Sequence, residues 1–337
     1  MGKLGTRLST APLPRSVSAA WGRFWFLPES TAPIELFRIA FGALTVLWTL
    51  SLAPTLMAFY GPGAAVPETP ALESGAWTLF SLIHSPSVIW VVWFATLLAA
   101  VGVLVGYRTR LAAAIVFVAM LSFERQAPNV FNTGDFLLRM LALYLALSPA
   151  GTAVSADRWF SGAAPIWSFP RRAPWALRLM QIQLSALYLS AVWEKVQGQL
   201  WREGSAVSYA LRIGDFERLP TPSWLSDSIV LSELMTFGTL TTELAIAILV
   251  WNRTARPWVL GLGVLMHLGI AITLDIGFFS VAVLTMYLAF VPPERAEALL
   301  TGGRDRVRAR RQRRVIRRRR SDGPQRETGD GQASLSN

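Results

Sequence analysis

One lysine stands out as a group that could do chemistry. The chain has 337 residues and 32 lysines and arginines, of which only Lys3 and Lys195 are lysines. Lys195 closes the apolar stretch 174–195, where a membrane helix would meet water. Lysine loses its proton far more readily than arginine when it is desolvated, so it can act as a base. We take Lys195 and its neighbour Glu194 as candidate catalytic residues; the alternative is a lysine that merely snorkels to the membrane surface.

A polar stripe runs along the same expected helix. Steps of three and four residues place its members on one helical face. The stripe consists of Arg178, Gln181, Ser185, Tyr188, Val192 and Lys195. Because lipid cannot satisfy polar groups, this face should turn toward protein or a cavity. The stripe predicts an interior seam that leads to Lys195.

Further charges are expected at the same level of the membrane. Glu124 and Arg125 end one expected span, and Asp135 begins the next. Arg139 follows Asp135 by one turn, which gives an i,i+4 pair of opposite sign. We expect these groups to lie near Lys195 and to orient it or tune its charge. The alternative is structural ion pairing between helices.

Two ionisable residues fall near the middle of later spans. Glu243 lies in the stretch 229–251, and His267 lies in the stretch 257–274. A carboxylate and an imidazole at this depth could bond to each other and relay protons. The alternative for His267 is a packing role. A metal centre is not expected, because the chain has no cysteine and its two histidines, His84 and His267, are far apart.

The composition predicts an integral membrane protein. Hydrophobic residues make up 53% of the chain and charged residues only 16%, against roughly a quarter charged in soluble domains. A span needs about 20 mainly apolar residues. We expect an all-α polytopic bundle of about eight transmembrane helices in one domain. The expected spans are 33–58, 87–106, 110–126, 135–149, 174–195, 229–251, 257–274 and 276–293.

The arginines predict the orientation and the role of the two ends. With both termini in the cytoplasm, the inner loops carry arginine and the outer loops near 59–86 and 127–134 carry neither lysine nor arginine. Only the outer loop 196–228 breaks the trend. We expect a plasma-membrane protein with an interfacial segment 1–30, a membrane domain 31–295 and a disordered basic tail 296–337. The arginine run 304–320 is expected to contact anionic lipid of the bilayer rather than nucleic acid.

Several distinctive stretches follow each other along roughly residues 30–295. They are ELFRIAFGALTVLWTL followed by FYGPGAAVP, PNVFNTGDFLLRMLALYLALSPAG, YLSAVWEKVQGQLWREGSAVSYAL, ELAIAILVW and MHLGIAITLDIGFFSVAVLTMYLAFVPPE. Together and in this order, they resemble one family, the HTTM domain proteins, which include the vitamin K-dependent gamma-glutamyl carboxylases.

The resemblance implies a function for the lysine. Lys195 matches the lysine regarded in the carboxylases as the base that starts vitamin K hydroquinone chemistry. A quinol is the implied lipid-soluble partner. The residues expected to bind it are Arg139, Asp135, Tyr188, Trp201, Glu243 and His267. The sequence has Asn132 to Asp135 where the carboxylases have a histidine near a Gly-Asp turn, and we expect no large lumenal domain after the membrane part. The implied activity is therefore quinol-linked proton abstraction or oxidation with a lysine base, without the substrate-protein carboxylation domain. The alternative is a non-enzymatic lipid or small-molecule transport or immunity-type protein.

Overall fold

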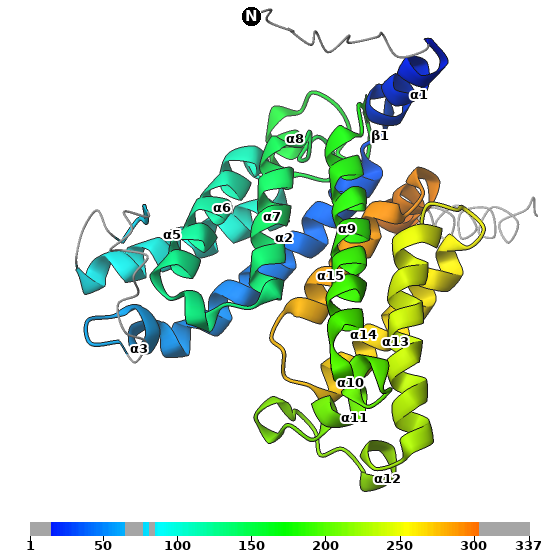
Figure 1. Ribbon diagram of the computed structural model, residues 1–337. Helices are drawn as coiled ribbons and strands as arrows, with labels where there is room; N and C mark the ends of the chain where they lie inside the picture. Colours follow the sequence, from blue (N-terminus) through cyan, green and yellow to red (C-terminus); the bar gives the residue numbers. More distant parts are fainter. Residues whose placement is uncertain (1–14, 65–76, 81–84, 303–337) are drawn as a thin grey trace, which may run out of the picture.

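The structure is a computed structural model that describes residues 15–64, 77–80 and 85–302 (Figure 1). In this part of the chain, helices form the architecture. One short antiparallel pairing joins β1 (Glu29–Ser30) to β2 (Arg171–Arg172). Lys3, His84 and the arginine run 304–320 lie outside the described residues, so the expectation for the basic tail stays a prediction.

The first half of the chain forms one group of packed helices. The chain enters it through α1, which packs against the later helix α9. Within the group, α2 packs on α5, α5 on α6, and α6 on α7. The elements are α1 (Arg15–Phe26), α2 (Ala32–Leu52), η1 (Ala53–Thr55), α3 (Leu56–Tyr60), α5 (Pro86–Val105), α6 (Thr109–Gln126), η2 (Pro128–Val130), α7 (Thr133–Leu147) and α8 (Ala156–Ser161).

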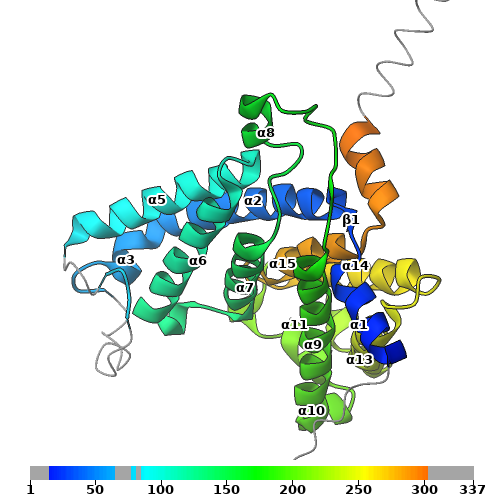
Figure 2. The same cartoon turned by 90° about the horizontal axis from the view of Figure 1, so that it is seen from above.

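The second half forms another group, built on α9. There α9 packs on α13, and α13 packs on α14. The helix α15 lies between the two groups and contacts α2, α7, α9 and α14 (Figures 1 and 2). The elements are α9 (Trp175–Gln197), α13 (Ile229–Leu249), α14 (Arg256–Thr273), α15 (Phe279–Tyr287) and η4 (Leu288–Phe290).

Four helical stretches in the described residues are long and apolar enough to cross a membrane. These are Ala32–Tyr60, Pro86–Val105, Ile229–Leu249 and Arg256–Thr273. Each of the eight expected spans coincides with a helix, yet α7 has only 15 residues and α15 only nine. The structure therefore establishes an all-helical chain with four candidate spans, and the number eight stays a prediction.

The loop expected at 196–228 is folded, and we call residues 199–226 the cap. Its elements are α10 (Gln199–Arg202), α11 (Ala206–Leu211), η3 (Gly214–Phe216) and α12 (Ser223–Ser226). Two of the arginines that break the charge trend hold it in place. Arg212 donates to the Ser226 carbonyl at 2.8 Å, and Arg218 pairs with Asp275 at 2.6 Å. These arginines therefore have structural partners.

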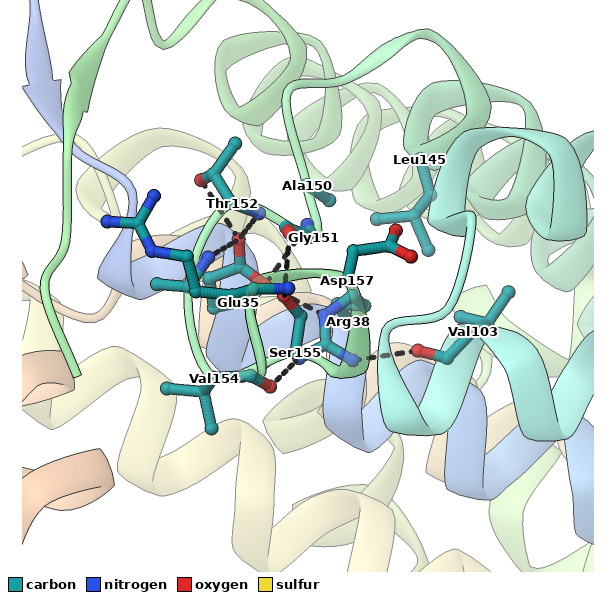
Figure 3. A network of polar contacts seen from close by, with 12 residues as sticks. Glu35, Arg38, Val103, Leu145, Ala150, Gly151, Thr152, Val154, Ser155 and Asp157 are labelled. Atoms are coloured by element: carbon teal, nitrogen blue, oxygen red, sulfur yellow. Dashed lines mark hydrogen bonds and ion pairs between the residues drawn. The ribbon is translucent and has the colours of Figure 1, made fainter. Parts of the chain in front are cut away.

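A buried ion pair joins the start of α2 to its neighbours (Figure 3). Glu35 and Arg38 are fully buried and 2.8 Å apart. The Glu35 carboxylate accepts backbone N–H groups from the turn after α7, including that of Thr152 at 2.8 Å. Arg38 donates to the carbonyls of Val103 and Val154 at 2.8 and 2.7 Å. Because further hydrogen bonds satisfy both charges, this buried pair can be tolerated.

Candidate functional site

The polar stripe of α9 is an interior seam, as its spacing predicts. At one end Arg178 pairs with Glu29 at 2.5 Å. One turn on, the Gln181 side chain is buried and donates to the Ala289 carbonyl at 2.7 Å. At the other end the seam reaches Lys195. Helix α9 therefore directs its polar face toward α13, α14 and α15 rather than toward lipid.

Lys195 lies against a carboxylate and an aromatic ring. Its Nζ donates to Oε1 of Glu243 on α13 and lies 5.1 Å from the centroid of the Trp201 ring. The Lys195 side chain is 23% exposed and that of Glu243 8%. The second carboxylate oxygen, Oε2 of Glu243, is buried without a hydrogen-bond partner in the described part of the chain. An unfilled acceptor of this kind is costly and calls for a functional explanation.

Behind this pair, three buried side chains form a hydrogen-bonded chain. The Tyr188 hydroxyl lies 2.8 Å from Nε2 of His267 and 2.5 Å from the Tyr287 hydroxyl. On its other side, Nδ1 of His267 lies 3.4 Å from Oγ of Ser280. A bond between His267 and Glu243 was one of the two possibilities that the sequence left open, and the partners of His267 are Tyr188 and Ser280 instead. Since hydroxyl and imidazole groups both donate and accept, the chain can hold or pass a proton.

A cavity of about 910 Å³ brings these groups together. It lies between α9, α13, α14 and the cap, and most of its lining is apolar. Six residues singled out from the sequence line it: Tyr188, Glu194, Lys195, Trp201, Glu243 and His267. The volume falls within the range of about 300–1,000 Å³ typical of small-molecule sites. Glu194 has an exposed side chain, so Glu243 rather than Glu194 is the carboxylate paired with Lys195.

Asp135 and Arg139 lie away from the cavity, and the prediction of an ion pair between them is wrong. Asp135 belongs to the capping box that starts α7: its carboxylate accepts the Asn132 N–H at 3.0 Å and the Trp48 indole N–H at 2.7 Å. Arg139 reaches α6 and pairs with Glu124 at 2.5 Å. Among the described residues that line the cavity, neither is present.

Sequence reasoning missed Tyr287 and the cap. Tyr287 is one of six tyrosines in the chain and ends an apolar helix, so its hydroxyl needed a partner at membrane depth. That signal was present in the sequence. The cap residues that line the cavity, such as Val207 and Leu211, carry no comparable signal because they are ordinary apolar residues.

The family model of the HTTM domain matches residues 26–294, most of the chain. This chain belongs to the HTTM domain family. Comparison with curated proteins and with solved structures gave no match. HTTM domains are associated with vitamin K-dependent carboxylase-like membrane proteins. Together with the four apolar helices, membership of the HTTM family indicates a membrane protein.

Proposed function

We propose that this HTTM protein is a membrane enzyme that takes a proton from a quinol or a similar lipid-soluble molecule. The observation that carries the proposal is the position of Lys195 in the cavity wall, between Glu243 and the Trp201 ring. An apolar cavity with a few converging polar groups suits a small molecule that dissolves in lipid. The association of the family with carboxylase-like proteins favours the same class.

Lys195 acts as the general base in this proposal. Its neutral amine takes the proton of a phenolic hydroxyl group: the O–H bond breaks, an N–H bond forms, and the electron pair stays on the oxygen. Glu243 then accepts a hydrogen bond from the resulting ammonium group, and a charge-assisted bond of this kind is a strong one.

The hydrogen-bonded tyrosines and His267 position the reacting group. Tyr188 and His267 both line the cavity beside the Lys195 pair. A second hydroxyl of the quinol could exchange hydrogen bonds with them, since each can donate or accept. Asp135 and Arg139 contribute to the site only indirectly, by stabilising the packing of α7.

The test of the base is Lys195→Arg in protein reconstituted in lipid nanodiscs. Once deprotonated, a naphthoquinol passes its electrons to dissolved oxygen and becomes the quinone, so oxygen uptake reports on the base. Arginine keeps the charge but does not give up its proton, so this oxygen uptake should be lost while the protein still inserts and folds. Lys3→Arg is the matched control and should keep the wild-type rate. Equal rates for the two variants would remove the base role from Lys195.

The alternative is a non-enzymatic protein that carries a lipid or small molecule in the same cavity. The size of the cavity and its apolar lining favour this reading as well. Wild-type protein that binds the naphthoquinone, shows no turnover and keeps the same affinity in Lys195→Arg would favour carriage over catalysis.

A further inference from the structure

Helices α13 and α14 are in contact near the turn that joins them, and open space adjoins both of them farther along. Near the turn, a Cβ atom added to Gly263 would lie 2.7 Å from Cδ1 of Ile246. Toward the other end, a Cβ atom added to Gly238 or to Gly269 would meet no atom within 4 Å. The two helices are therefore in close contact at one end, and open space adjoins both of them at the other.

This open space belongs to the cavity. Gly238 and Gly269 line it, and so do Leu234 of α13 and Leu265 of α14. These two leucines are 67% and 68% exposed on the outside of the molecule. Side chains that line a cavity and are also exposed lie at its mouth. Since α13 and α14 are both long and apolar enough to cross a membrane, this mouth faces lipid.

The cap covers the end of the cavity and is fastened to both helices. On the α13 side, the Ser232 hydroxyl donates to the Gly204 carbonyl at 2.9 Å. On the α14 side, the N–H of Asp275 donates to the Phe216 carbonyl at 2.7 Å, and Arg218 pairs with the same aspartate. Because the cap is held at both sides, a ligand would enter the cavity through the opening between α13 and α14.

We infer that the cavity takes its ligand sideways from the bilayer, through a portal between α13 and α14 that Gly238 and Gly269 keep open. The ligand class is an amphiphile with an apolar body and one polar head. The body lies among the leucines of the mouth, and the head reaches Lys195 and Glu243. A hydroxyl or N–H donor on that head suits the carboxylate oxygen of Glu243 that has no partner among the described residues. The inference rests on the proposed function in taking this cavity as the substrate site.

The portal can be tested without any substrate, because the chain has no cysteine of its own. Thr242 lines the cavity one turn from Gly238 and serves as the reporter position, as Thr242→Cys. In phosphatidylcholine nanodiscs, a dodecyl maleimide dissolved in the lipid should modify this thiol faster than a sulfonated maleimide in the water. Adding Gly238→Leu or Gly269→Leu fills the open space and should slow the lipid-borne reagent by an order of magnitude or more.

The matched control is Gly261→Leu on α14. A Cβ atom there also meets nothing within 4 Å, but Gly261 does not line the cavity. It should leave the rate unchanged. Three results would each overturn the portal: faster reaction with the sulfonated reagent, portal variants that react as fast as Thr242→Cys alone, or no modification by either reagent. Neither reagent depends on quinol chemistry, so this result is independent of the test of Lys195 as a base.

Discussion

At the scale of single residues, the Tyr188 hydroxyl connects the polar groups of the cavity wall. It is buried and lies within hydrogen-bonding distance of both His267 and Tyr287. In the described part of the chain, the Tyr287 hydroxyl forms its hydrogen bond with Tyr188 alone. Lys195 and Glu243 form the second polar unit of the wall. Both units line the same cavity, so a few hydrogen bonds hold the polar side chains of its wall in place.

Tyr188→Phe should destabilise the protein more than Tyr287→Phe. The first change removes the partner of the Tyr287 hydroxyl and of Nε2 of His267, whereas after the second the Tyr188 hydroxyl keeps its bond to His267. Each unsatisfied buried group costs about 1–3 kcal/mol. Thermal unfolding in detergent measures the difference. Tyr209→Phe is the control, since this tyrosine is 56% exposed. Equal losses at Tyr188 and Tyr287 would contradict the central place of Tyr188 in the hydroxyl chain.

The residues that α9 contributes to the site could be predicted from the sequence better than the contact with Glu243 on α13. The face of α9 that carries Tyr188 and Lys195 follows from helical spacing alone. Glu243 lies 48 residues from Lys195, and their contact depends on how α13 packs against α9, which no local pattern determines. The error at Asp135 was avoidable. Asn132 followed three residues later by an acidic side chain is the local signature of a capping box.

At the scale of elements, close packing of α2 on α5 depends on Gly42. A Cβ atom added there would lie 2.5 Å from the Cα atom of Leu104, in the backbone of α5. No rotation of a side chain can relieve that contact. The expected helices and most of their limits followed from apolar runs and turn residues, but which helix faces which depends on such contacts between distant residues.

Gly42→Ala should therefore lower the unfolding temperature, because the two helix backbones must move apart. Gly261→Ala makes the same chemical change where nothing lies within 4 Å. It should be neutral or stabilising, because alanine favours a helix over glycine by about 0.8–1 kcal/mol. Both variants can be compared by thermal unfolding in the same detergent. Losses of similar size would contradict the close approach of α2 and α5.

At the scale of the whole molecule, α8 and the cap lie at opposite ends (Figure 1). The composition was enough to predict an all-helical membrane protein, because a low charged fraction and long apolar runs leave few other folds. It was not enough to count the helices that cross the bilayer. Short and polar-striped helices such as α7 and α9 can be supported by neighbouring helices as well as by lipid.

The expected orientation places α8 in the cytoplasm and the cap outside. Single cysteines at Ser161→Cys in α8 and Ser223→Cys in α12 test it in a chain without native cysteine. An impermeant maleimide added to intact cells should label the second variant and spare the first until the membrane is opened. Labelling of the α8 variant from outside would reverse the orientation that the arginines predict.

The portal between α13 and α14 makes the site sensitive to the physical properties of the bilayer. The helices are in contact near Gly263, and the cap bridges their other ends, so splaying them must stretch the cap. Membrane helices adjust their tilt when their apolar length differs from the thickness of the bilayer, at a cost of fractions of a kcal/mol per Å. We therefore expect the width of the mouth to respond to membrane thickness, so that the lipid environment itself sets how readily the cavity fills.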